Sequence, residues 1–257
     1  MCQLLGMSSK APSNIAFSFE GFHRRGGSTG EHADGWGIAF FEEHTWRIFL
    51  DSQPSAVSRL ARFVCDHPIK SRNVIAHIRK ATQGEVHLAN THPFRRELWG
   101  QEWIFAHNGN LVTPPDCEGL RFQPVGTCDS EKAFCWLLSQ IAQVFPQAPT
   151  ENELAALLKQ LAAHLTQSGS FNFLLGWCDL LFAHCSTELW YLIRKAPFSE
   201  AHLADADLSI DFSKVNTPDD CMAIIATQPL TRNENWHPFL PGELRIFRNG
   251  LPLSLPA

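Results

Sequence analysis

The sequence predicts an α+β fold built on antiparallel sheets, and three observations support this. About ten short segments have the branched and aromatic composition of strands, and most are joined by short connections. Helices, recognised by apolar residues three or four positions apart, fall in groups between the strands and do not alternate strictly with them. We find no internal repeat, low-complexity tract or linker, so we expect a single domain over residues 1–257.

Composition excludes several classes of protein. The 257 residues are 44% hydrophobic and 18% charged, which is typical of a globular chain. A formal charge of -5 argues against a nucleic-acid partner, which would require clustered Lys and Arg. No apolar run approaches the roughly 18 residues of a membrane span and no signal peptide is present, so we expect no membrane partner and a cytoplasmic location.

The eight cysteines are scattered without a disulfide framework, and we expect them to be reduced. No Cys-x-x-Cys pair or His-Glu-x-x-His run occurs. The sequence therefore predicts no metal site and no cofactor.

The first six residues, Met1-Cys2-Gln3-Leu4-Leu5-Gly6, begin a predicted strand. If Met1 were removed, Cys2 would carry a thiol and a free α-amine whose ordinary pKa of about 7.7 to 8.0 lets it accept a proton near neutral pH. One residue would then supply both nucleophile and general base. The alternative is a cysteine that is simply buried on the first strand.

The next elements are a helix at 12–25, a glycine-flanked turn and an apolar hairpin. The turn, Asp34-Gly35-Trp36-Gly37, leads into a strand that ends at Phe41, and 46–50 is its return strand. These glycines permit close backbone approach or positive φ, but taken alone an ordinary turn is the better interpretation of them.

A helix at 56–64 and a buried strand at 73–78 follow, and the strand ends at Arg79. A guanidinium at the end of a buried strand could clamp a carboxylate in a cleft, but a surface arginine is the simpler interpretation. In the loop at 90–94, His92 is expected to pack and not to act as a ligand.

An aromatic strand at 103–107 runs into Asn108-Gly109, which is usually a turn. The same pair could offer a side-chain amide and an unobstructed backbone N–H to one point, as in an oxyanion hole. A helix then begins near Asp129, and this residue could cap the helix or hold an ammonium group.

The remaining chain is predicted to contain the clearest helix and five strands. The helix covers 151–167, and its leucines have core-facing spacing. A hairpin at 171–176 and 180–185, a third strand at 189–193, an exposed acidic loop at 201–220, and strands at 221–227 and 244–248 follow.

Taken together, these motifs are more specific than any one of them. Cys2, His77-x-Arg79-x-x-Thr82, Asn108-Gly109 and Asp129-Ser130-Glu131 resemble, in order, the signature of class II glutamine amidotransferases, which are N-terminal-nucleophile (Ntn) hydrolases. Segments 34–37, 90–94 and 229–231 with Trp236 resemble the stand-alone branch of that family more narrowly. The resemblance spans nearly the full chain.

The resemblance implies a four-layer αββα sandwich, with two antiparallel sheets between helical layers. It implies that Cys2 attacks the γ-amide of glutamine or another γ-glutamyl compound, that Asn108 and Gly109 stabilise the oxyanion, and that a thioester forms and is hydrolysed. Arg79, with Thr82 beside it, would hold the substrate α-carboxylate. Asp129 would hold its α-ammonium.

Two departures leave alternatives open. While Met1 is present, the Cys2 nitrogen is acylated and cannot act as a base. No synthetase or phosphoribosyl-transfer domain is expected after the glutaminase portion, so the protein would be either an amidohydrolase or a glutaminase subunit that delivers ammonia to a separate acceptor protein. A third alternative is a catalytically silent ligand-binding domain of the same fold.

Overall fold

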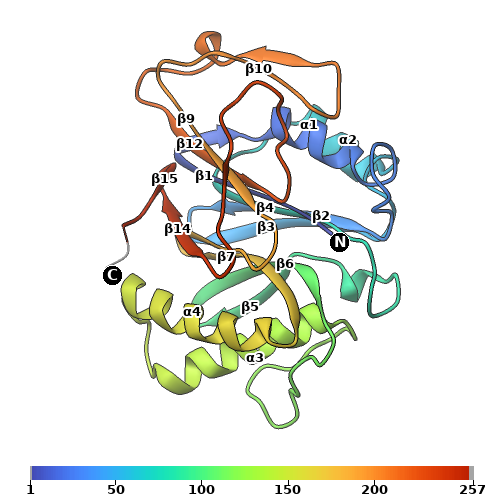
Figure 1. The fold of residues 1–257 in the computed structure, drawn as a ribbon, viewed down its shortest axis with the longest axis vertical. Coiled ribbons are helices and arrows are strands. Elements are labelled where there is room, and N and C mark those ends of the chain that lie inside the picture. The colour runs from blue at the N-terminus through green and yellow to red at the C-terminus, as the bar shows by residue number, and fades with distance from the viewer. Residues whose placement is uncertain (1, 255–257) are drawn as a thin grey trace.

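The structure is a computed structural model that describes residues 2–254. Figure 1 shows four layers: α1 (Ala16–Arg24) and α2 (Arg59–Asp66), then two sheets, then α3 (Asp129–Val144) and α4 (Glu151–Thr166). Neighbouring strands in both sheets run antiparallel. The predicted α+β class and the four-layer αββα sandwich are confirmed.

The first sheet has seven strands and carries the amino-terminal segment near its centre. In spatial order they are β13 (His237–Pro238), β9 (Trp190–Lys195), β12 (Cys221–Ala226), β1 (Gln3–Asn14), β4 (Lys70–Ile78), β2 (Trp36–Glu42) and β3 (Thr45–Asp51). Strand β1 is therefore bonded to a partner on each side.

The second sheet has six strands. In spatial order they are β15 (Leu251–Pro252), β14 (Leu244–Arg248), β8 (Leu180–His184), β7 (Gly169–Trp177), β6 (Gln101–Leu111) and β5 (Phe94–Leu98). A separate hairpin of β10 (Glu200–His202) and β11 (Ser209–Asp211) lies at the end of the molecule beyond α1 (Figure 1), and the single-turn helices η1 (Leu88–Asn90) and η2 (Phe212–Lys214) complete the elements.

The three interfaces between the layers form three hydrophobic clusters. On β1, Leu4 belongs to the cluster between the sheets, while Leu5 belongs to the cluster beneath α1 and α2. The third cluster joins the second sheet to α3 and α4. Because side chains alternate across a strand, a strand covered on both faces must be apolar at successive positions, as β1 is.

Most predicted elements are present, with shifted ends. The helix expected at 12–25 begins only at Ala16, because β1 continues to Asn14. The helix expected at 56–64 begins at Arg59, after the N-cap Ser58, whose side chain accepts the Ala61 N–H. The fifteen strands found in residues 2–254 exceed the predicted ten because β10, β11, β13 and β15 are very short and β5 is largely charged.

Two expectations about the later part of the chain are wrong. The segment at 201–220 is not simply an exposed loop, because Ala201, Leu203 and Phe212 are buried in it and its acidic residues mask that apolar minority. Strand β9 does not extend the β7–β8 hairpin; it pairs with β12 in the first sheet.

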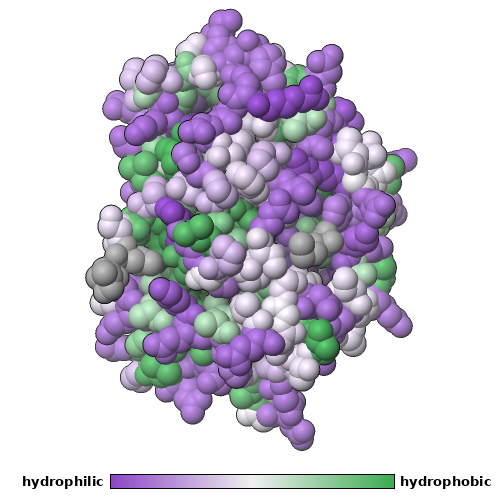
Figure 2. Space-filling view, in the orientation of Figure 1, coloured by the Kyte–Doolittle hydropathy of each residue, from purple (hydrophilic) through white to green (hydrophobic). Residues whose placement is uncertain are grey.

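The surface and the thiols agree with the composition. Figure 2 shows a largely hydrophilic end of the molecule around β10, whereas hydrophobic residues reach the surface at the level of the sheets. Within residues 2–254, no helix combines the length and the apolarity needed to cross a bilayer. All eight cysteines are free.

Candidate active site

Cys2 lies immediately before β1, where the strand meets the end of β4. The register pairs Gln3 with Ile78, so the thiol lies next to the residues that follow β4. Its Sγ accepts the Lys80 backbone N–H at 3.3 Å, and the thiol can donate to the Lys80 carbonyl at 3.4 Å. The residue is 7% exposed. Burial raises the pKa of the Cys2 thiol, so the resting group is protonated and requires a base.

Asn108 belongs to the second sheet and reaches the start of β1 through Thr227. The Asn108 Nδ2 donates to the Thr227 Oγ1 at 3.1 Å, and the Leu4 backbone N–H donates to the same oxygen at 2.9 Å. Thr227 follows β12, so one hydroxyl joins three strands from two sheets. The second N–H of the Asn108 amide is not used by this bond.

The expected turn at Asn108-Gly109 is wrong as a description of the backbone. Strand β6 continues to Leu111, and Asn108 pairs with Asn172 and Gly109 with Phe171 on β7. A Cβ on Gly109 would lie 1.9 Å from the Ser170 carbonyl oxygen. Glycine is needed here because the strands approach closely, and not because a turn requires it.

Arg79 is buried, so the simpler interpretation of a surface arginine is wrong. Its guanidinium donates to the carbonyls of Gln83, Gly84 and Glu85 at 2.9 to 3.0 Å. The positive charge also lies close enough to lower the pKa of the Cys2 thiol, against the larger effect of burial. Arg79 thus orders the loop after β4, and its charge acts on the Cys2 thiol.

The other two predicted substrate-binding residues differ in position. Asp129 is buried in the first turn of α3, and its Oδ2 accepts the Leu111 backbone N–H at 2.9 Å. Cys128 is the N-cap, so Asp129 is not the cap of this helix. The Asp129 charge acts on both Cys2 and His107. Thr82 is exposed in the loop after β4, and no described contact ties it to Cys2.

Three buried histidines, His77, His92 and His107, lie next to one another. The His77 Nε2 lies 3.0 Å from the His107 carbonyl oxygen, and the rings of His77 and His92 have centroids 4.0 Å apart. Burial lowers the pKa of His77 to about 3 and that of His92 well below its ordinary value. His92 therefore packs as a neutral ring, as the sequence predicted.

Arg25 and Thr227 are two residues that sequence reasoning did not select. Buried Arg25 follows α1 and donates to the Gln3 Oε1 at 3.2 Å, to the Pro229 carbonyl at 2.8 Å and to Asp205. It fixes the residue after Cys2 to the chain that follows β12. The motif at 229–231 marked this region, but nothing in the sequence connected it to position 25.

Together these residues place a thiol, a side-chain amide, one positive charge and one negative charge around the start of β1. The opposite charges suit an amino-acid group, and the amide suits a developing oxyanion. The one group of three His, Cys, Asp or Glu side chains within residues 2–254 that could share a cation lies elsewhere, on α1 and α2.

The αββα fold, with two antiparallel sheets between helical layers, is of the Ntn type. The chain belongs to the class II glutamine amidotransferases, because the sequence model of that family, "Glutamine amidotransferases class-II", matches residues 1–256.

Relatives support this membership over nearly the full length. The chain is 52% identical over 250 residues to "Putative glutamine amidotransferase YafJ" of Escherichia coli, covering 96% of this chain and 97% of that protein. It is 50% identical over 250 residues to "Putative glutamine amidotransferase" of Haemophilus influenzae, covering 97% of this chain and 85% of that protein. A crystal structure of a "predicted glutamine amidotransferase from Pseudomonas aeruginosa" is 42% identical, with a TM-score of 0.78 and coverage of 98% and 100%.

Proposed function

We propose that this protein hydrolyses the γ-amide of glutamine or of another γ-glutamyl compound, with Cys2 as nucleophile after removal of Met1. That removal concerns a residue outside the described part of the chain. The observation that carries the proposal is that the charges of Arg79 and Asp129 both act on the Cys2 sulfur. In addition, the Asn108 amide is held to the strand that follows Cys2 through the Thr227 hydroxyl.

The chemistry begins with a protonated thiol. Because burial raises the pKa of Cys2, the α-amine freed by loss of Met1 would take the thiol proton as the sulfur attacks the amide carbon. The Asn108 amide and the Gly109 N–H would stabilise the oxyanion, a contribution of about 3 to 4 kcal/mol for one such donor. The C–N bond then breaks, the leaving amine takes the proton, and a γ-glutamyl thioester remains.

Hydrolysis of the thioester completes the reaction. The same α-amine would accept a proton from water, the water oxygen would attack the thioester carbon, and the sulfur would leave with a proton. The products are glutamate and free Cys2. Arg79 would pair with the substrate α-carboxylate and Asp129 with the α-ammonium, so a simple amide without these charges would bind poorly.

The experiment is labelling with a glutamine-derived diazoketone, followed by intact-mass and peptide analysis. One adduct at Cys2 among eight thiols, absent in Cys2→Ala and retained in Cys128→Ala, is the expected result. Cys128 is a suitable control because it is also buried and lies beside Asp129. Labelling that persists in Cys2→Ala would refute the assignment of the nucleophile.

A second measurement defines the substrate. A panel of γ-glutamyl amides is scored for glutamate and for free ammonia or amine. Glutamate release that occurs without another protein supports an amidohydrolase. Release only in the presence of an added acceptor protein would instead support the glutaminase-subunit alternative.

A further inference from the structure

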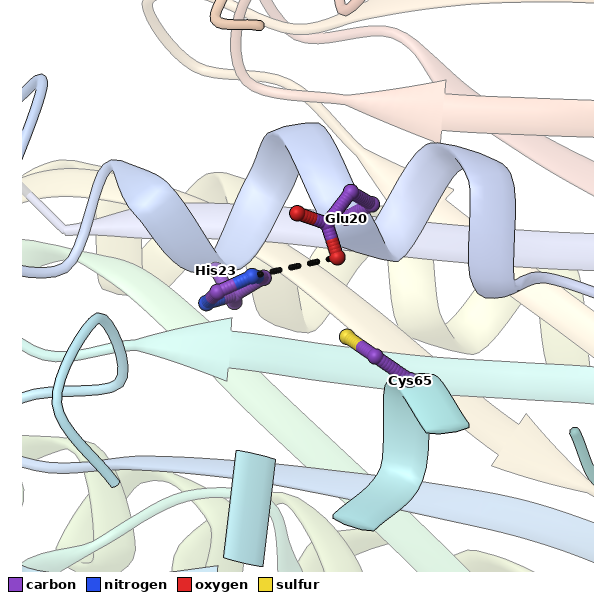
Figure 3. A group of neighbouring side chains, drawn as sticks. All are labelled: Glu20, His23 and Cys65. Atoms are coloured by element: carbon purple, nitrogen blue, oxygen red, sulfur yellow. Dashed lines mark ion pairs between the residues drawn. The ribbon is translucent and has the colours of Figure 1, made fainter. Parts of the chain in front are cut away.

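A group of side chains suited to a metal ion lies in the outer helical layer, apart from the proposed active site. Glu20 and His23 are one turn apart on α1, and Cys65 is on α2. Figure 3 shows the three side chains pointing into the space between the helices. One ligand atom from each lies within 4.8 Å of the other two.

The state of His23 requires an explanation. Its side chain is buried, with the residue 3% exposed, and within residues 2–254 neither ring nitrogen makes a hydrogen bond of normal geometry, although Ser55 and Glu20 lie close to the ring. The Glu20 Oε2 lies 3.5 Å from the His23 Nε2, so a carboxylate oxygen and an imidazole nitrogen face each other in this buried position. A buried polar group without a partner is unfavourable, and a bound ion is one way to satisfy it.

Glu20 uses its two oxygens differently. Oε1 accepts from the Arg24 Nε at 3.2 Å and Nη2 at 2.8 Å, while Oε2 faces His23. Arg62 approaches Oε2 only to 4.0 Å, and its side chain is 60% exposed, so it can move away. One carboxylate oxygen therefore remains directed toward the imidazole and the thiol.

We propose that Glu20, His23 and Cys65 bind one divalent cation of the zinc type, through a carboxylate oxygen, an imidazole nitrogen and a thiolate. Oxygen, nitrogen and sulfur ligands together favour Zn²⁺ over Mg²⁺ or Ca²⁺. Ligand atoms of a tetrahedral zinc lie about 3.3 to 3.8 Å apart, so contraction of about 1 Å from the observed separations is sufficient. Binding releases the Cys65 thiol proton to solvent and leaves the fourth position to water.

The proposal departs from the sequence-based expectation of no metal site. That expectation came from searching for closely spaced ligands, whereas Cys65 joins Glu20 and His23 only because α1 and α2 pack together. The ion would hold these two helices to each other. It would also fix the end of α1, after which Arg25 reaches Gln3 beside the proposed nucleophile.

The test is titration of chelator-treated, reduced protein with Co²⁺, which gives a thiolate-to-Co²⁺ charge-transfer band when sulfur is a ligand. We expect one equivalent per chain, displaced by Zn²⁺. Cys65→Ser should abolish the band, and His23→Gln should weaken binding at least about tenfold, since losing even an outer partner of a ligand costs that much. Cys2→Ala should retain the band, which separates this site from the proposed nucleophile.

Two results would overturn the proposal: no thiolate band in the reduced wild-type protein, or a band that survives Cys65→Ser. Circular dichroism shows whether each variant is folded. If Cys65→Ser does not fold, His23→Gln provides the second test of the site.

Arg62→Gln tests the Glu20 carboxylate, because removing the competing positive charge should tighten Co²⁺ binding. Unchanged or weaker binding in that variant would overturn the role of Glu20.

Discussion

Replacing Thr227 with Val tests the connection between the predicted nucleophile and the predicted oxyanion hole. The substitution keeps the shape of the side chain and removes one oxygen. That oxygen accepts from the Leu4 backbone N–H at 2.9 Å and from the Asn108 Nδ2 at 3.1 Å, and Thr227 is buried. Both donors would lose this acceptor in a region that water does not reach.

The expected loss of stability follows from these two donors. A buried donor without a partner costs about 1 to 3 kcal/mol, so two of them amount to roughly 2 to 6 kcal/mol. Thr227→Ser keeps the oxygen and loses a methyl group, for which about 1 kcal/mol is expected. Urea unfolding of the three proteins, with m unchanged, gives both differences directly.

The same substitution should affect the proposed reaction. Without Thr227, the Asn108 amide is free to rotate, so kcat for glutamate release should fall about 10- to 100-fold, less than the effect of removing an oxyanion donor outright. KM should change little, because neither substrate charge is touched. A loss of stability below 1 kcal/mol together with an unchanged kcat would refute the inference that this hydroxyl positions both residues.

Three further predictions concern the residues around this connection. Arg79→Lys should raise KM for glutamine sharply in steady-state kinetics, because an ammonium cannot form a two-pronged contact with a carboxylate; an unchanged KM would reject the assignment. Gly109→Ala should markedly lower the urea midpoint, because the new Cβ would lie 1.9 Å from a carbonyl oxygen. In the control Gly100→Ala the new Cβ meets no atom within 4 Å, so the loss should be limited to about 1 to 2 kcal/mol for the left-handed φ of +70°. Burial lowers the pKa of His77 to about 3, so below about pH 6.5 the unfolded chain binds a proton on this ring and the folded chain does not. The free energy of unfolding should therefore be highest above about pH 6.5 and fall by up to roughly 5 kcal/mol toward pH 3. Unfolding curves across this range that show no such slope would contradict a buried neutral ring.

Long periodic segments made much of the fold predictable. The leucines of α4 and the apolar strands β4 and β7 carry enough pattern to identify them from sequence alone. The layering came from family resemblance, because apolar periodicity shows which face of an element is buried and not what covers it. Strand β5 escaped prediction because Arg95, Arg96 and Glu97 interrupt its apolar pattern, although it pairs along its length with β6.

The residues of the candidate site could be selected from sequence where the family motif includes them, but not where they are joined only by long-range contacts. Cys2, Arg79, Asn108 and Asp129 were selected by motif, and the structure brings them together. Thr227 lies 223 positions from its partner Leu4, and no local pattern indicates such a hydrogen bond. The metal-binding group proposed on α1 and α2 was invisible for the same reason, since its ligands converge only through helix packing.

The position of Cys2 at the start of a central strand bears on the proposal that a residue so near a chain end is the nucleophile. Chain ends are usually poorly ordered, and a loosely held sulfur could not meet a fixed oxyanion hole. Here β1 pairs with β4 on one side and β12 on the other, and the Leu4 N–H is fixed by Thr227 only two residues from the sulfur. Asn108 donates to the same hydroxyl from the second sheet. One hydroxyl therefore links the proposed nucleophile to the proposed oxyanion donor, which is why one buried oxygen should affect both stability and kcat.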